Sequence, residues 1–274
     1  MRSGRRYTTA DGTPTTGVFS TLNSILSIIN TVDPTHVVIP FDAGGNVRKT
    51  ESDTYKANRT PPSENFITES RILKDEALYA MGLETVGIRG VEADDILYTF
   101  SHIAQFGTDR FDEVVIATVD QDILQCATSR CKILLFNSAK KQQLMGVEEI
   151  EEKFGYGPDD IRFIKAISGD ASDNIIGVKG VGPKTAVKIM VEADWNFEKA
   201  LEHKKLVDHR EHILSNLDLV TLRNITGTLG PVDWSYHTLG LGLKADLESF
   251  LTTYECNSLL KRLPSVLKTL RVKI

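Results

Sequence analysis

The chain has 274 residues, of which 41% are hydrophobic, 25% charged and 7% aromatic, all average fractions for a globular protein. They exclude collagen-like and low-complexity chains, and no apolar run approaches the roughly 18 residues that a membrane-spanning helix needs. Three cysteines without a CxxC pair argue against a disulfide framework or a zinc knuckle, and we expect a cytoplasmic protein. The formal charge of −5 disfavours a nucleic-acid binder unless basic residues gather in one place.

The first half of the chain alternates helical and strand patterns. In chain order they predict a helix over 17–29, a strand over 35–42, a polar loop or loosely held helix over 50–66, a helix over 67–81, a strand over 83–88, a helix over 91–106, a strand over 113–119, a helix entered through 120–127 and a strand over 132–137. This order predicts an α/β fold with a mostly parallel central sheet and helices on both faces.

The pattern becomes helical from about residue 145 onward. Helix-like segments separated by glycines and prolines cover 146–155, 158–170, 183–193, 196–204 and 209–223. We therefore predict an α/β domain over 1–144 and a helical domain over 145–274.

Acidic residues recur at the ends of the predicted elements, where open parallel sheets bind ligands. They are Asp42, Glu92, Asp94, Asp95, Asp120, Asp122, Asp170 and Asp173. A dense carboxylate cluster needs cations, and oxygen donors suit Mg²⁺ or Mn²⁺ better than zinc. Two such ions about 4 Å apart support attack of water on a phosphodiester. Each acid taken alone fits a helix cap or a solvated surface residue better than a metal ligand, whereas for the whole set spacing leaves both interpretations open.

The segment GVKGVGPKTAVKIM (177–190) is a second candidate site. Pro183 separates Gly182 from Lys184 and no strand precedes the segment, so it departs from a nucleotide-binding Walker A loop. A tight glycine turn leading into a helix would leave backbone N–H groups free for an anion, with Lys179 and Lys184 beside them. This pattern indicates a binding site for a nucleic-acid phosphate that is independent of base sequence. A plain helix–helix corner is the alternative.

A third candidate lies in the polar segment 50–66, where Tyr55, Lys56, Asn58 and Arg59 stand together. Interleaved basic and aromatic side chains can hold a phosphate and stack on a base. Beside a carboxylate cleft they would supply the positive charge that a phosphodiester transition state needs. An ordinary solvated face is the alternative.

Together these stretches resemble the 5′-nuclease family, which includes bacteriophage flap endonucleases and the 5′-nuclease domain of bacterial DNA polymerase I. The resemblance covers residues 7–225 and rests on TTADGTPTTGVFSTLNSIL, PTHVVIPFDAGG, TYKANRTPP, GVEADDIL, ATVDQDILQ and GDASDNIIGVKGVGPKTA. The chain resembles the free-standing bacteriophage 5′-3′ exonucleases more than the fused bacterial domain. The resemblance implies a PIN-like α/β core with a helical arch at 50–66 and a helix-three-turn-helix motif at 170–192.

The resemblance also implies roles for the candidate residues. A first metal site is implied at Asp42, Glu92, Asp94 and Asp95, and a second at Asp120, Asp122, Asp170 and Asp173. The arch is implied to carry the catalytic residues Tyr55, Lys56 and Arg59, with Lys56 and Arg59 on the scissile phosphate. The turn that holds duplex DNA, in this family often with a K⁺ ion, is implied at Gly177, Lys179, Gly180, Gly182, Lys184 and Thr185.

The implied activity is that of a structure-specific 5′-3′ exonuclease or flap endonuclease in DNA replication or repair. It would hydrolyse DNA near single-strand/duplex junctions with two or more Mg²⁺ or Mn²⁺ ions. Expected partners are DNA with a 5′ flap or end and replication proteins, with the protein a monomer away from any membrane. The alternatives are a non-catalytic DNA-junction binding module and, less favoured, a PIN-like nuclease acting on RNA.

One part of the family pattern is missing from this sequence. The family begins with an apolar strand that ends in a metal-ligating aspartate, whereas the match here starts near Tyr7. Asp11 follows no apolar strand and is not accepted as a substitute. We expect a start codon upstream of Met1, or else a gap in the sheet, which sequencing of the preceding DNA would decide.

Overall fold

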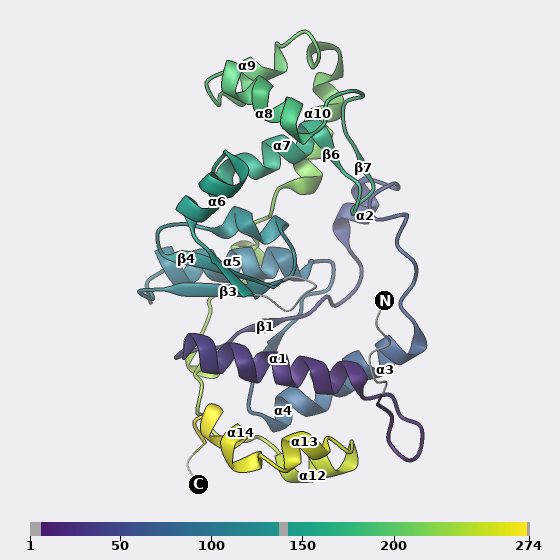
Figure 1. Cartoon of the computed structure of the whole chain (residues 1–274), viewed down its shortest axis with the longest axis vertical. Coiled ribbons are helices and arrows are strands. Elements are labelled where there is room, and N and C mark those ends of the chain that lie inside the picture. The colour runs from purple at the N-terminus through teal and green to yellow at the C-terminus, as the bar shows by residue number, and fades with distance from the viewer. Residues whose placement is uncertain (1–6, 137–141, 273–274) are drawn as a thin grey trace. The chain divides into compact units, whose positions relative to one another are not determined.

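The computed structural model describes residues 7–136 and 142–272 of the chain (Figure 1). Packing divides the chain into two compact units that alternate along the sequence. The first consists of Met1–Phe41, Thr60–Val86 and Gly230–Ile274, and the second of Asp42–Arg59 and Gly87–Leu229. Every candidate site residue lies in the second unit. The division predicted at residue 144 stays a prediction.

The first unit forms around α1 (Thr16–Val32), where Val18, Leu22, Leu26 and Ile29 recur at helical spacing and are buried. Its other helices are α3 (Glu64–Ile72), the π-helical turn η1 (Leu73–Ala77), α4 (Leu78–Ala80), the 3₁₀ turn η5 (Trp234–His237), α12 (Leu247–Thr253), α13 (Asn257–Leu260) and α14 (Leu263–Thr269). Strands β1 (Ile39–Pro40) and β2 (Thr85–Val86) pair in parallel. The predicted helix over 67–81 is therefore present as α3, η1 and α4 in succession, and both predicted strands are shortened to two residues.

The second unit contains a sheet of order β3-β4-β5. Strand β3 (Val114–Thr118) pairs in parallel with β4 (Cys131–Phe136), which pairs in antiparallel fashion with β5 (Gln142–Met145). Helix α5 (Ala93–Phe106) and the 3₁₀ turn η2 (Asp122–Cys126) pack against this sheet. The sequence did not predict β5, because its residues QQLM are mostly polar and exposed. Residue 137, the last of the predicted strand, lies outside the described residues.

From α6 (Val147–Phe154) onward the second unit is mostly helical, as predicted, and a short helix, α2 (Val47–Glu51), precedes the sheet. The other helical elements are η3 (Pro158–Asp160), α7 (Ile161–Ser168), α8 (Pro183–Glu192), α9 (Phe197–Leu201), η4 (Val207–His209), α10 (Arg210–Val220) and α11 (Thr226–Leu229). A short hairpin of β6 (Gly169–Asp170) and β7 (Ile175–Ile176) joins α7 to α8. Helices α7 and α8 bury Ile164, Ile167 and Ile189 in a shared apolar core.

The α/β class with parallel strand pairs is thus confirmed. The described strands do not form the single central sheet that was expected. They form separate sheets of two, three and two strands. No helix of the described ranges 7–136 and 142–272 is long and apolar enough to span a membrane.

Candidate functional site

The acids predicted for the first metal site surround the start of helix α5. Asp42 is exposed and its Oδ1 accepts the backbone N–H of Ala93 at 2.8 Å, so its carboxylate faces the positive end of the helix dipole. Asp94 and Asp95 occupy the first turn of α5, and Glu92 immediately precedes it. The helix start therefore gathers four carboxylates from two segments distant in sequence.

Two of these acids are held by protein cations. Glu92 Oε2 accepts from Arg48 at 2.6 Å, and its Oε1 accepts from Asn46 at 2.8 Å and from Lys56. Asp95 receives both terminal nitrogens of Arg48, at 2.7 and 2.8 Å. Sequence reasoning missed Arg48, because a single arginine in a polar segment carries no spacing signal.

The pKa of Asp94 is raised by its surroundings. Burial raises the pKa of its carboxyl to about 6, and the negative charges of Asp120, Glu92 and Asp42 add to this rise against the opposing charge of Lys56. Two of these neighbours, Asp42 and Asp120, are exposed to solvent. The carboxylates around Asp94 are thus incompletely neutralised by the protein, and a cation would relieve their repulsion.

The acids predicted for the second metal site meet a lysine that sequence reasoning did not single out. Lys165 of α7 pairs with Asp122 and, at 2.6 Å, with Asp170. Burial alone would raise the pKa of Asp170, but hydrogen bonds from Lys165 and Ser172 outweigh it and hold the value at about 2. On a helix with an ordinary amphipathic pattern, the position of Lys165 gave no signal of this contact.

The fourth acid of that set, Asp173, lies with the predicted arch residues. Arg59 donates to its Oδ1 at 2.6 Å, and the Tyr55 hydroxyl lies 3.1 Å from Asp173 and 3.1 Å from Glu92. Burial together with the charges of Glu92 and Asp173 raises the pKa of Tyr55, which keeps its hydroxyl protonated. Lys56 is buried, with a positive φ of 55°.

Backbone contacts join this segment to the β6–β7 turn. The Lys56 amide donates to the carbonyl of Asp173 at 2.8 Å. The side chain of Asn174 donates to the carbonyl of Thr54 at 2.7 Å, and that of Asn58 donates to the carbonyl of Ala171 at 3.1 Å. The structure therefore brings the cationic segment and the acidic turn together.

The glycine-rich segment forms the turn between β7 and α8. Gly177 approaches the preceding helix so closely that an added Cβ would lie 2.1 Å from the Ser168 carbonyl carbon. Gly180 has a φ of +78°, and Pro183 takes the first position of α8. Of the residues predicted to bind DNA, those on the exposed side of the turn are Lys179, Gly180, Gly182 and Lys184, and those partly covered are Gly177 and Thr185.

The turn presents free donors to solvent. Among the described residues, the backbone N–H groups of Gly182 and Lys184 donate to no protein acceptor. With the two exposed lysines they form a positive, hydrogen-bonding surface suited to a phosphate.

The donor set of the site fits a hard divalent cation. All predicted ligands are carboxylates, without histidine or cysteine, which suits Mg²⁺ or Mn²⁺. Within 7–136 and 142–272, no three acidic, histidine or cysteine side chains stand together as a ready ligand group. Lys56 pairs with Glu92, and Lys165 pairs with both Asp122 and Asp170. The fit therefore rests on donor chemistry and on the uncompensated charge around Asp94.

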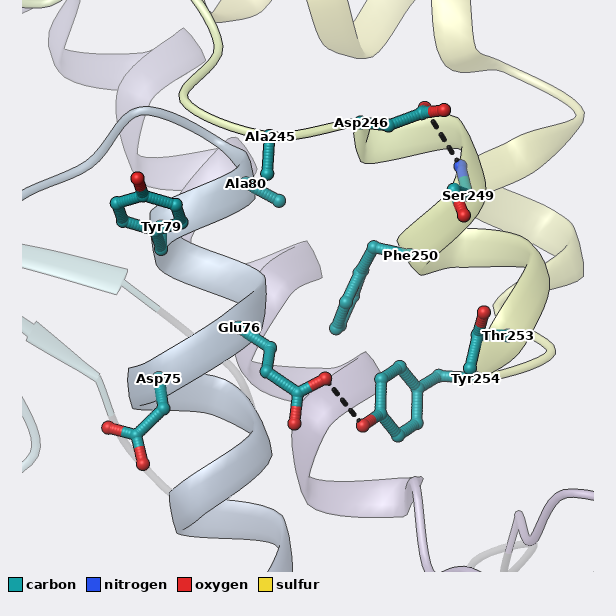
Figure 2. A pocket seen from close by; sticks show the side chains of 10 residues that line it. All are labelled: Asp75, Glu76, Tyr79, Ala80, Ala245, Asp246, Ser249, Phe250, Thr253 and Tyr254. Carbon is teal, nitrogen blue, oxygen red and sulfur yellow. Dashed lines mark hydrogen bonds between the residues drawn. The ribbon is translucent and has the colours of Figure 1, made fainter.

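A separate pocket of about 300 Å³ lies in the first unit and contains none of the predicted site residues. Figure 2 shows its acidic and aromatic lining from η1, α4 and α12. The Tyr254 hydroxyl donates to Glu76 at 2.7 Å across this pocket (Figure 2).

Comparison with known proteins agrees with the motifs. The family described as "5'-3' exonuclease, N-terminal resolvase-like domain" matches residues 2–155 of the chain. The chain belongs to this family. It is 34% identical over 241 residues to DNA polymerase I of Rhizobium leguminosarum, covering 84% of this chain and 23% of that protein. It is also 33% identical over 198 residues to a 5′-3′ exonuclease of Bacillus subtilis, covering 72% of this chain and 65% of that one. The chain thus spans less than two thirds of these relatives.

Solved structures of related fold agree with the architecture. A T5 5′-exonuclease with bound divalent metal ions (zinc) superposes with a TM-score of 0.60 at 22% identity, covering 93% of this chain and 92% of that one. A bacteriophage T5 flap endonuclease in a complex with DNA and metal ions gives a TM-score of 0.63 at 21% identity, covering 92% and 90%. The catalytic core of Rad2 with a DNA substrate gives 0.54 at 18% identity, covering 93% and 84%. These similarities establish the fold.

Proposed function

We propose that the protein is a divalent-metal-dependent 5′-3′ exonuclease or flap endonuclease that hydrolyses DNA near single-strand/duplex junctions. Family membership supports nuclease chemistry, and the T5 structures of like fold are described with metal ions and DNA. The observation that carries the proposal is the placement of Asp42, Glu92 and Asp94 at the start of α5. Burial, together with the negative charges of Asp120, Glu92 and Asp42, raises the pKa of Asp94 there. Carboxylates around one helix start, with Lys56 paired to Glu92 and Arg59 paired to Asp173, suit a cation and a phosphate together.

The carboxylates and the cations of the site would have different roles. Asp120, predicted for the second site, acts on Asp94, so it would join Asp42, Glu92 and Asp94 in holding one cation. Asp122, Asp170 and Asp173 would serve a second cation, whereas both oxygens of Asp95 accept protein donors. When bound, divalent ions activate the attacking water and stabilise charge on the leaving oxygen. Lys56 and Arg59, now paired with Glu92 and Asp173, would turn to the scissile phosphate and neutralise its developing charge. Tyr55 keeps its proton and remains a hydrogen-bond donor beside them.

The glycine-rich turn would hold the duplex by its backbone. Free amides of Gly182 and Lys184 and the charges of Lys179 and Lys184 suit phosphate contacts that read no sequence. A K⁺ ion at this turn, replication-protein partners, a monomeric state and a cytoplasmic location belong to the same proposal.

The test is cleavage of a 5′-flap duplex in Mg²⁺ or Mn²⁺ and in EDTA. We expect cleavage only with the metal, releasing mononucleotides or short flaps. Asp120→Ala should abolish cleavage, because it removes a proposed metal ligand. It should spare duplex binding in EDTA, because Asp120 is exposed and its side chain makes no described hydrogen bond beyond the local turn at Asp122. Full activity of Asp120→Ala would refute its assignment to the metal site.

A non-catalytic DNA-junction binding module is the second candidate. One observation favours it: Lys165 and Lys56 already occupy carboxylates predicted to bind metal. Binding of the flap duplex without cleavage at any metal concentration would decide for this module.

A further inference from the structure

Arg48 is a buried cation in the acidic site of the second unit. It lies on the short helix α2, and only 3% of its surface is exposed. Its NH1 donates to Glu92 at 2.6 Å and to Asp95 at 2.7 Å. Its NH2 donates to Asp95 at 2.8 Å and to the carbonyl of Thr221 at 2.9 Å. The rigid guanidinium of Arg48 thus donates four hydrogen bonds, to two acids and to one distant backbone carbonyl.

Asp95 is fully engaged by these contacts. Besides Arg48, its Oδ1 accepts the backbone N–H of Arg223 at 2.8 Å, and only 3% of the residue is exposed. Both oxygens of Asp95 therefore serve the protein, unlike Asp42 and Asp120, which face solvent. Arg223 in turn pairs with Glu51 at the other end of α2. The end of α10 is thereby fastened to the start of α5.

Glu92 has two cationic partners that differ in freedom. Lys56 belongs to the segment proposed to meet the DNA phosphate, so its contact with Glu92 would be given up when substrate binds. Arg48 is locked by Asp95 and Thr221 and would stay. Arg48 is therefore the cation that stays on the Glu92 carboxylate, beside the neutral donors Asn46 and Tyr55, while a cation and a phosphate occupy the site.

We infer that Arg48 is a positioning residue for the metal site and that Asp95 is its anchor rather than a metal ligand. The inference rests on the proposed function. Partners that orient ligating carboxylates typically change metal affinity by about 10- to 100-fold when they are altered. Arg48→Lys keeps the positive charge but cannot form the bidentate fork. Asp95→Asn keeps the shape of the side chain but loses its negative charge.

The experiment measures Mn²⁺ binding by isothermal titration calorimetry with the metal alone, using wild type, Arg48→Lys, Asp95→Asn and the double variant. We expect the Kd for Mn²⁺ to rise by about 10- to 100-fold in each single variant, and the double variant to be no worse than the poorer single one, because both changes break one unit. Cleavage kinetics should show a lower kcat that recovers as Mn²⁺ is raised, with KM for the flap duplex unchanged. Arg110→Lys, an exposed arginine of the same unit, is the control.

Wild-type Mn²⁺ affinity in Arg48→Lys would overturn the inference. Additive losses in the double variant would also overturn it, since Asp95 would then act on the metal independently. Thermal melting in EDTA checks folding, and loss of folding in both single variants would show a purely structural pair. If wild type itself neither bound Mn²⁺ nor cleaved, the proposed function would fail first, and that failure is recognisable because it appears without any substitution.

Discussion

Replacing Gly177 with alanine is predicted to break the turn between β7 and α8. The φ of Gly177 lies outside the left-handed region, so backbone strain is not the cause. An added Cβ would lie 2.1 Å from the carbonyl carbon of Ser168, 2.2 Å from its oxygen and 2.4 Å from the amide nitrogen of Gly169. All three are backbone atoms that cannot change rotamer, so the hairpin itself would have to move.

The cost of that movement can be bounded. Overpacking costs about 1–3 kcal/mol where side chains can adjust, and we expect the upper end, about 3 kcal/mol, because here the clash is with backbone. The hydrogen bond from Val178 to Ile167, 2.9 Å long, spans the same approach and would be lost. In a protein of this size each kcal/mol lowers Tm by about 2–4 °C, so the expected shift is about 6–12 °C.

Two neighbouring glycines provide matched controls. Gly182→Ala should stay within about 0.5 kcal/mol of wild type, since its φ is −82° and nothing lies within 4 Å of an added Cβ. Gly180→Ala should cost about 1–2 kcal/mol from its φ of +78° alone, with open space around it.

The assay combines thermal melting by circular dichroism with fluorescence anisotropy on a labelled duplex in EDTA. Gly177→Ala should lose both stability and duplex binding, whereas Gly182→Ala should keep its stability. A Gly177→Ala variant with the wild-type Tm and duplex affinity would refute the steric argument and the placement of this turn.

Three further predictions concern other parts of the chain. Lys184→Ala should weaken duplex binding and reduce the slope of log K against log salt by about 1, whereas the same change at exposed Lys74 of the first unit should leave both unchanged, as anisotropy over a salt series would show. Burial and the hydrogen bond to Glu76 raise the pKa of Tyr254 from 10.0 to about 12. The stability that the Tyr254 hydroxyl contributes is therefore complete below pH 10 and is lost as the pH rises toward 12. Between pH 10 and 12 the urea midpoint of Tyr254→Phe should fall less than that of wild type, and equal falls would contradict the pairing. Burial raises the pKa of Cys256 to about 11, so iodoacetamide at pH 8 should label this thiol only after urea is added, and rapid labelling of the native protein would show the burial to be wrong.

Much of the architecture was readable in the amino-acid order. The alternation of apolar periodicities predicted α1, α5, β3 and α8 close to their actual bounds, because local hydrophobic spacing depends only on neighbours in the chain. Elements with weak local signals were missed, such as the polar edge strand β5 and the two-residue strands of the hairpin. Their pairing depends on what lies opposite, which no local pattern records.

The candidate site shows the same division more sharply. Sequence determined that acids stand at the ends of elements and that glycines and lysines share one turn, since residue type and spacing are properties of the chain itself. Only the tertiary structure decided which of those acids face each other around Asp94 and which are taken by Arg48 and Lys165. Arg48 and Asp95 are 47 positions apart, and Lys165 and Asp122 are 43 apart. Burying a charge costs free energy unless an opposite charge lies beside it. Because these partners are distant in sequence, the pairs that set the charge state of each carboxylate form only when the chain folds.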